Sequence, residues 1–215
     1  MYEAYKAVYE GKTGELVEKK SRFIATVFSI ESEEEALEKV AEMKKKYWDA
    51  KHNCYAYVLG QNQELMRFSD DNEPQGTAGK PMLDVLLGEG VHYTVAVVTR
   101  YFGGTLLGTG GLVRAYTKGA KIAIDAAGKS MKRVWTVLYV PCPYTYYERM
   151  KLEVEAFGGV IRKTDFGSEV ELEILIAQPK TQAFLDRLTD MTAGTVEALE
   201  VAQEYRAFPV SQEEV

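Results

Sequence analysis

Two glycine-rich segments on either side of a β-branched run constrain this chain more than any other feature. The segments are residues 75–81 (QGTAGKP) and 103–111 (GGTLLGTGG), and the run between them is residues 93–101 (YTVAVVTRY). Glycine lets backbone N–H groups come close to a ligand, because it has no Cβ to obstruct the approach. An acidic cluster lies directly before the first segment. We therefore expect residues 67–114 to form a binding site.

Length and composition predict a folded protein of one large or two small domains. The chain has 215 residues, of which 46% are hydrophobic and 27% are charged, which disfavours disorder. The net charge of −6 argues at first against nucleic acid as a ligand, but the charge is uneven. Residues 134–215 carry 7 Lys and Arg against 14 Asp and Glu, whereas residues 1–133 carry 19 against 18. The N-terminal part can therefore present a basic face.

The cysteines and the hydropathy pattern predict a cytoplasmic protein. Cys54 and Cys142 lie far apart and outside any metal-spaced pattern, which excludes a disulfide scaffold and favours a reducing compartment. The first residues lack an apolar core of signal-peptide length. No run reaches the roughly 18 apolar residues needed to cross a bilayer, so we expect no membrane contact.

Hydrophobic periodicity predicts strands and helices throughout residues 16–128. Residues 16–30 form a strand pair or one bent strand, interrupted by Lys19-Lys20-Ser21 and apolar on both faces. Ser32 and Glu35 make a capping box for a helix that runs to about Tyr47. Further strands are expected at residues 53–59, 65–68 and 91–102, and helices at residues 82–87 and 112–127, the last one ended by Gly128.

A short basic segment, residues 129–133, is interpreted as a linker, after which the pattern resets. A β-α-β-β-α-β order follows, with elements at residues 134–140, 144–157, 160–166, 169–177, 181–191 and 195–207. This is the order of a ferredoxin-like fold. The strand at 169–177 alternates apolar residues with glutamates, so one face of the sheet is expected to be open. The prediction is an α+β protein with domains at residues 1–130 and 134–209.

The segment at residues 103–111 lies between a strong strand and a strong helix, so the N–H groups of the helix start point into it. It is neither a Walker loop nor the dinucleotide fingerprint, because the spacing of both is missing. Three interpretations of this segment remain: contact with phosphate or a nucleic-acid backbone, tight packing of small residues, and a nucleotide pocket. The phosphate interpretation assigns the ligand contacts to Gly103, Gly104, Gly108, Gly110 and Gly111.

Three cations accompany the glycines. Arg100 and Arg114 flank residues 103–111, and arginine matches phosphate bidentately. The alternative for both is an ion pair with one of three carboxylates. Lys80 stands at a helix start, where a cation opposes the helix dipole, and this indicates a functional role. The carboxylates in question are Asp70, Asp71 and Glu73.

The same carboxylates could hold Mg²⁺ or act as acid and base, but no further ligand completes a set. Loop solvation or pairing with arginine is the alternative. His52 and Cys54 share a strand face without a third orienting group. We therefore predict no catalytic residue, no metal ligand and no cofactor.

Several strings of this sequence resemble the IMPACT/YigZ family. They are SRFIA (residues 21–25), AKHNCYAY (50–57), FSDDNEPQGTAG (68–79), RYFGG (100–104) and LGTGGLVRAY (107–116). The D-D-[GN]-E-P-x-G-T-A-G and R-Y-[FY]-G-G strings are long and peculiar to that family. The resemblance covers about residues 15–128, and the two-domain layout is similar to the bacterial branch. Arg22, Lys51 and His52 lie in these strings and complete the predicted set of RNA- or phosphate-binding residues.

The resemblance implies a fold for each domain. The first would have the left-handed βαβ-containing fold of the second domain of a small-subunit ribosomal protein. The second would be similar to domain V of elongation factor G. Members of the first fold class bind RNA or phosphate-bearing ligands, and eukaryotic relatives regulate translation by competing for an activator of a starvation-sensing kinase. Bacterial members have at times been labelled peptidases, and the incomplete catalytic set argues against that label.

Together these observations predict a non-catalytic protein that binds RNA or the ribosome and is linked to the regulation of translation. A protein partner is expected on the open sheet of the second domain. One alternative is a Mg-dependent phosphotransferase or hydrolase that acts on small molecules and uses the acidic and glycine-rich loops. The other is a regulator that binds only proteins.

Overall fold

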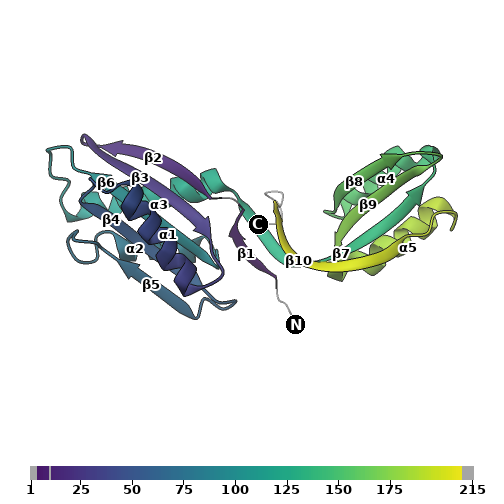
Figure 1. The fold of residues 1–215 in the computed structure, drawn as a ribbon, viewed down its shortest axis with the longest axis horizontal. Coiled ribbons are helices and arrows are strands. Elements are labelled where there is room, and N and C mark those ends of the chain that lie inside the picture. Colours follow the sequence, from purple (N-terminus) through teal and green to yellow (C-terminus); the bar gives the residue numbers. More distant parts are fainter. Residues whose placement is uncertain (1–3, 10, 210–215) are drawn as a thin grey trace. The chain divides into compact units, whose positions relative to one another are not determined.

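The chain divides into two compact units. A computed structural model describes residues 4–9 and 11–209. The N-terminal unit comprises Tyr5–Met131 with residues 207–209, and the C-terminal unit comprises Lys132–Arg206 with Ala4. Figure 1 shows the elements of both units.

A five-stranded sheet forms the centre of the N-terminal unit. Its strand order is β2-β3-β6-β4-β5, and all of its pairings are antiparallel. The hairpins of β2 with β3 and of β4 with β5 confirm the predicted strand pair and the predicted hairpin. The strands are β2 (Lys12–Glu18), β3 (Ser21–Ser29), β4 (His52–Leu59), β5 (Leu65–Ser69) and β6 (Thr94–Tyr101).

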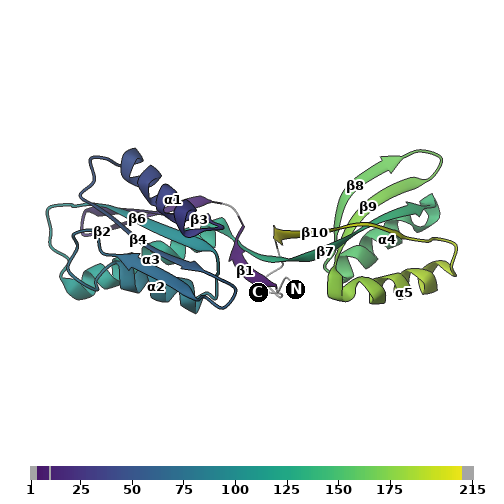
Figure 2. The same cartoon turned by 60° about the horizontal axis from the view of Figure 1, so that its bottom comes forward.

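Helices cover both faces of this sheet. Figure 2 shows α1 (Glu33–Lys46) on one face and α2 (Gly79–Gly88) and α3 (Thr109–Ala127) on the other. Two hydrophobic clusters result, one beneath α1 and a larger one beneath α2 and α3. Alternate residues of β6 enter the two clusters, because successive side chains of a strand point to opposite faces. The predicted burial of residues 16–30 on both faces is confirmed for β3.

Local signals in the sequence set the helix ends. Ser32 Oγ accepts a hydrogen bond from Glu35 N at 3.2 Å, as the predicted capping box requires. Gly128 ends α3 with a φ of +72°, a backbone conformation that glycine adopts without strain. α3 begins at Thr109, so the last three residues of the predicted glycine loop belong to the helix instead.

The turn between β2 and β3 is made by Lys19 and Lys20. Both have positive φ angles, +46° and +67°. Two-residue hairpin turns require this backbone, and Asn-Gly is the usual sequence for it. The turn therefore places two lysines in strained conformations at the end of the sheet.

The C-terminal unit has the predicted β-α-β-β-α-β order. Its strand order is β10-β7-β9-β8, and Figure 2 shows both of its longer helices on one face of the sheet. The elements are β7 (Lys129–Cys142), α4 (Tyr144–Ala156), β8 (Val160–Phe166), β9 (Val170–Ala177), the short 3-10 helix η1 (Gln178–Lys180), α5 (Thr181–Thr192) and β10 (Leu199–Pro209).

Two predicted boundaries are wrong. Residues 129–133 are not a linker but the start of β7, because they pair with a strand that the sequence analysis did not assign, β1 (Tyr5–Val8). β10 begins at Leu199 rather than at residue 195, because Thr195 N bonds to the carbonyl of Thr192 and closes a turn there. The expected tail, residues 210–215, lies outside the described residues.

The uncovered face of the C-terminal sheet is partly charged and partly apolar. The predicted alternation is confirmed, since Val170, Leu172, Ile174 and Ile176 enter the core under the helices. On the other face Arg162 bridges Glu173 and Glu204. Leu175 is fully buried although it shares that face. This face is therefore not a uniform apolar surface.

Candidate functional site

A buried ion pair joins the two glycine-rich segments. Arg100, on β6, and Glu73, in the loop before α2, are 2.6 Å apart (Nη1 to Oε1), and their side chains are 6% and 3% exposed. Tyr116 Oη donates to the same carboxylate oxygen at 2.8 Å. Arg100 therefore forms the ion pair with a carboxylate of the acidic cluster that the sequence analysis gave as the alternative to phosphate binding.

Two aromatic rings enclose the Arg100 guanidinium. Its carbon lies 5.5 Å from the Phe23 ring centre and 5.6 Å from the Phe102 ring centre. Nη2 donates to Ser21 Oγ at 3.4 Å, and Nε is buried without a hydrogen-bond partner. Ring faces attract a cation and so offset part of the cost of removing it from water. Arg100 thus holds the loop before α2, the end of β6 and the start of β3 together.

Asp70 organises the first glycine-rich segment. Its Oδ1 accepts hydrogen bonds from Ala78 N at 3.0 Å and Gly79 N at 2.8 Å, and its Oδ2 accepts one from Gly76 N at 2.8 Å. The first glycine-rich segment therefore brings its N–H groups close to a carboxylate of the protein itself. The carboxylate also supplies negative charge at the start of α2, where Lys80 lies, and Lys80 itself pairs with an aspartate one turn later.

Asp71 is also occupied. Its Oδ2 accepts from Asn53 N at 2.7 Å, its Oδ1 pairs with Lys44 Nζ at 2.8 Å, and its carbonyl contacts Nδ1 of His52 at 3.0 Å. All three carboxylates of the acidic cluster are therefore used by groups of the protein itself. In the described part of the chain, no group of three or more His, Cys, Asp or Glu side chains is arranged to hold a metal ion.

Cys54 belongs to the same buried network. Its Sγ lies 3.0 Å from the carbonyl of Asp70 and 3.4 Å from Tyr116 Oη. Burial raises the pKa of the Cys54 thiol well above its ordinary value. Because the thiolate is the reactive form, the cysteine is structural.

Residues 103–108 of the second glycine-rich segment make a packed turn. A Cβ on Gly103 would lie 2.0 Å from the backbone carbon of Lys20, and Gly103 N donates to Ser21 Oγ at 3.1 Å. Gly104 and Gly108 have φ angles of +82° and +72°. Close packing therefore accounts for Gly103, whereas positive φ angles in open space account for Gly104 and Gly108.

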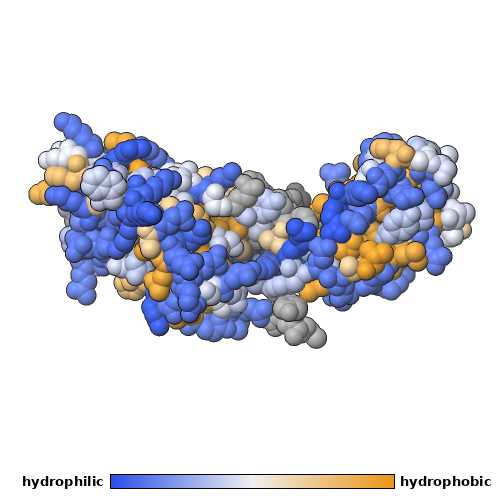
Figure 3. Space-filling model, in the orientation of Figure 1, coloured by the Kyte–Doolittle hydropathy of each residue, from blue (hydrophilic) through white to orange (hydrophobic). Residues whose placement is uncertain are grey.

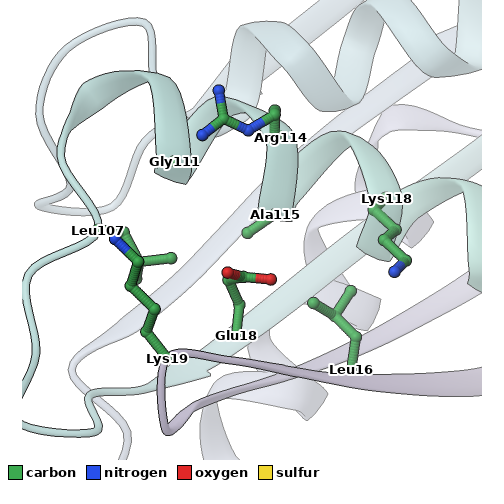
Figure 4. A pocket seen from close by; sticks show the side chains of 8 residues that line it. All are labelled: Leu16, Glu18, Lys19, Leu107, Gly111, Arg114, Ala115 and Lys118. Atoms are coloured by element: carbon green, nitrogen blue, oxygen red, sulfur yellow. The ribbon is translucent and has the colours of Figure 1, made fainter.

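The start of α3 is different, because it faces an open pocket of about 210 Å³. Gly108 caps the helix without a side-chain hydrogen bond, so N–H groups of the first turn are not used by a capping side chain. Figure 4 shows the pocket between the β2–β3 turn and α3. Its lining residues are Leu16, Glu18, Lys19, Leu107, Gly111, Arg114, Ala115 and Lys118.

Three cations line this pocket against one carboxylate. Lys19 rises from the turn, and Arg114 and Lys118 lie one turn apart on α3. Among residues 4–9 and 11–209, none of the three forms an ion pair. In contrast, Lys44 and Lys80 are paired with aspartates. The pocket therefore has a local excess of positive charge.

The predicted set of eleven residues falls into three groups. The structure brings Gly108, Gly110, Gly111 and Arg114 together at the start of α3, and it places Gly103 and Gly104 in the turn before it, where Gly103 is closely packed. Arg22 and Lys51 are exposed away from the pocket, Arg22 on the α1 face of the sheet, where its Nε pairs with Glu15 Oε1 at 2.7 Å, and Lys51 just before β4. The last group contacts loop or helix oxygen atoms and consists of His52, Lys80 and Arg100.

The sequence analysis missed two cations of the pocket. Lys118 follows Arg114 by four residues, and this spacing places both on one helix face, so it carried a usable signal. Lys19 lies beside them only because the β2–β3 hairpin packs on α3, and no local pattern reports that contact.

Comparison with known proteins identifies the family. A model of the Impact N-terminal domain matches residues 19–124, and a domain of unknown function, DUF1949, matches residues 140–195. The "IMPACT family member YvyE" of Bacillus subtilis (strain 168) is 37% identical over 194 residues, which cover 90% of this chain and 89% of the relative. This chain belongs to the IMPACT family. The prediction made from the sequence strings is confirmed.

Other members of the family match along most of their length. The "IMPACT family member YigZ" of Escherichia coli (strain K12) is 36% identical over 187 residues, 86% of this chain and 92% of the relative. A solved structure titled "Crystal structure of an hypothetical protein" has a TM-score of 0.60 and 34% identity, and covers 94% of this chain and 99% of that chain. The two-domain α+β architecture is thus shared.

The strings that identify the family meet in the buried network. Glu73 comes from the DDNEP string and Arg100 from the RYFGG string. In this chain the two strings therefore stabilise the fold of the site, while the exposed cations of the pocket lie beside them. No helix among the described residues is both long and apolar enough to span a bilayer.

Proposed function

We propose that this protein binds RNA, free or within the ribosome, through phosphate contacts at the start of α3. The role would be a non-catalytic one in the regulation of translation in the cytoplasm. The observation that carries the proposal is the set of three cations, Lys19, Arg114 and Lys118, which line one pocket and form no ion pair with any described residue. Such a site attracts phosphate groups.

The helix start adds to this attraction. The first turn of an α-helix carries roughly half a positive charge in its N–H groups, and Gly110 and Gly111 keep side chains away from them. Glu18 opposes the cations from the turn. The balance of charges remains positive, as binding to a phosphate backbone requires.

The proposal includes the two fold likenesses expected from the family. These are the second domain of a small-subunit ribosomal protein for the N-terminal unit and domain V of elongation factor G for the C-terminal unit. A mixed α+β architecture in two units is compatible with both. The likeness to the ribosomal-protein domain supports the proposal, because members of that fold class bind RNA or phosphate-bearing ligands.

A salt titration of RNA binding tests the proposal. The affinity of the full chain for a labelled RNA oligonucleotide would be measured by fluorescence anisotropy at increasing salt concentrations. Arg114→Ala and Lys118→Ala should each weaken binding and reduce the slope of log K against log salt by about 0.7–0.9. Lys80→Ala is the matched control, because Lys80 is paired on α2. The proposal fails if the wild type does not bind at low salt, or if both pocket variants bind like the wild type.

A protein partner of the C-terminal unit is a second candidate. One face of its sheet has no helix over it, and Leu199 and Val201 on β10 are 54% and 56% exposed. In Figure 3 hydrophobic residues gather on the visible face of this unit. Co-purification with a protein that survives nuclease treatment, and that is lost in the double variant Leu199→Ser, Val201→Ser, would support it. Capture that depends on RNA would oppose it.

The Mg-dependent alternative has weaker support. Its carboxylates would have to bind a metal, but Asp70, Asp71 and Glu73 already accept hydrogen bonds or ion pairs from the protein. A thermal-shift screen of nucleotides with and without Mg²⁺ separates the two ideas. A metal-dependent shift with a nucleotide, without RNA binding, would favour the enzyme.

A further inference from the structure

A second group of exposed side chains crosses the end of the N-terminal sheet, on the face that α1 covers. Val17 and Arg22 are cross-strand partners on β2 and β3, and Arg22 and Tyr101 are partners on β3 and β6. Lys51 directly precedes His52, the first residue of β4, which pairs with Arg100, the residue before Tyr101. Phe23 and Arg100 face the α3 side, so these neighbours along the strands face the α1 side.

Trp48 is the residue before Asp49, whose carboxylate binds Tyr101 of this row, and its side chain is 82% exposed. It belongs to the turn that ends α1, where Tyr47 N bonds to the carbonyl of Met43 at 2.9 Å and Ala50 N to that of Tyr47 at 3.0 Å. Tyr101 Oη donates to Asp49 Oδ1 at 2.7 Å and ties the turn to β6. A large apolar ring is thus presented to water by a backbone that hydrogen bonds hold in place.

The row combines rings with cations. Arg22 and Lys51 are both exposed, and the ion pair of Arg22 with Glu15 lies at the surface, where such pairs are weak. Single exposed apolar residues are common and need no ligand. An exposed indole on a hydrogen-bonded turn that is tied to Tyr101, at a sheet end that also carries an arginine and a lysine, instead matches a surface on which bases stack while phosphates are neutralised.

A basic path connects this row with the pocket of α3. Lys19 and Lys20 form the β2–β3 turn, Arg22 follows it on one face, and Lys19 lines the pocket with Arg114 on the other. The end of the sheet therefore carries cations from one face to the other. Both faces can contact one flexible strand of nucleic acid.

We propose that the ligand is single-stranded RNA, with a base stacked on Trp48 and with phosphates running from Lys51 and Arg22 round the turn to the pocket. This rests on the proposed function, because the pocket supplies the phosphate contacts. Duplex RNA keeps its bases stacked on each other, so it cannot place one on the indole. A strand of at least about four nucleotides is needed, the lower end of the range for single-strand sites.

The fluorescence of the protein provides a direct readout. The chain has two tryptophans, and Trp135 is 1% exposed, so quenching by a ligand at the surface reports Trp48. Titration of the full chain with a 12-residue oligouridine should quench the red-shifted part of the emission. A 12-base-pair RNA duplex should not. In Trp48→Phe the quenching should disappear while binding, measured by anisotropy of labelled oligouridine, persists.

Affinity measurements complete the test. Trp48→Ala should weaken oligouridine binding about tenfold, in line with the loss of one stacked base, and Trp48→Phe should restore most of it. Leu152→Ala is the control, because Leu152 is 66% exposed on α4 of the C-terminal unit; it should bind like the wild type. These results together would support the inference.

The opposite outcomes separate this inference from the proposed function. If RNA binding depends on salt but Trp48→Ala leaves it unchanged, the stacking site is wrong and the phosphate pocket still stands. The same result is expected if Trp48 contacts a protein partner instead of RNA. Equal affinity for duplex and single strand overturns the stacking site in the same way. If the wild type binds no RNA at low salt, the proposed function fails, and this inference fails with it.

Discussion

Arg100 and Arg114 lie at the two ends of one glycine-rich segment, but their surroundings are opposite. Arg100 is enclosed by rings and paired with Glu73, whereas Arg114 faces an open pocket and has no ion pair within the described residues. Both arginines fit the same sequence pattern. A glycine-rich segment therefore shows where the backbone comes close to another group. Whether that group belongs to the protein or to a ligand depends on whether a carboxylate of the protein already pairs with the neighbouring arginine.

The largest expected effect comes from breaking the buried pair. Arg100→Ala or Glu73→Ala leaves an uncompensated buried charge, which costs about 3–5 kcal/mol of folding free energy. Arg114→Ala should leave the stability unchanged, because its side chain is exposed. Urea unfolding followed by circular dichroism measures both. Equal stability of Arg100→Ala and Arg114→Ala would show that the contrast between the two sites is wrong.

Removal of the Asp70 carboxylate should have the next largest effect. Its three backbone N–H partners would lose their acceptors, and we expect a loss of about 2–3 kcal/mol from the unpaired donors and the missing helix cap. Asp84→Ala is the control, since among the described residues Asp84 pairs with the exposed Lys80 alone. The same urea experiment applies. A stable Asp70→Ala variant would mean that residues 75–81 are free to receive a ligand.

Alanine substitutions within the second glycine-rich segment test the difference between its packed part, at Gly103, and its open part, at Gly110. In Gly103→Ala the new Cβ meets the Lys20 backbone, and overpacking of this kind costs about 1–3 kcal/mol. In Gly110→Ala it meets only Arg114 Nη1 at 3.6 Å, and the helix gains up to about 1 kcal/mol. Opposite shifts in thermal unfolding are expected. Shifts of the same sign and size would contradict the division of this segment into packed and open parts.

The smallest effect concerns a partly buried carboxylate that contacts two lysines. Glu89 contacts Lys129 Nζ at 2.6 Å and Lys121 Nζ at 2.9 Å, and the hydrogen bond from Lys129 holds the pKa of its carboxyl below the ordinary value. A lowered folded-state pKa stabilises the protein above the unfolded pKa of about 4.3, and the gain is lost as the pH falls through the folded-state pKa.

We expect Glu89 to contribute at most about 1 kcal/mol, because its side chain is partly exposed. The measurement is the difference in unfolding free energy between pH 7 and pH 3.5 for the wild type and for Glu89→Gln. The variant should show a slightly smaller difference. An identical pH dependence would show that the two lysines do not stabilise the charged form.

Much of the fold could be predicted, because its signals are local. The capping box at Ser32, the cap at Gly128 and the alternation along β9 each depend on a few neighbouring residues. The pairing of β1 with β7 could not be predicted in this way, since it joins the two ends of the N-terminal unit. A basic segment therefore looked like a linker.

The site shows the same limit. The sequence offers three carboxylates to Arg100, and their spacing does not tell which one turns inward. The choice follows from two consecutive left-handed residues, Asp71 and Asn72, with φ angles of +41° and +70°, which redirect the chain just before Glu73. Neither residue is a glycine, so the turn gave no strong signal.

The pairing of β1 with β7 has a consequence for synthesis on the ribosome. β1 is synthesised roughly 120 residues before its partner β7, a delay of roughly 6–24 s at the usual rates of translation. During that time β1 can already form its isolated bridge between Lys6 and Val91. Pauses or truncations before residue 129 would leave a strand edge exposed to other chains. The N-terminal unit is therefore completed only when β7 is synthesised and pairs with β1, the strand at the start of the unit.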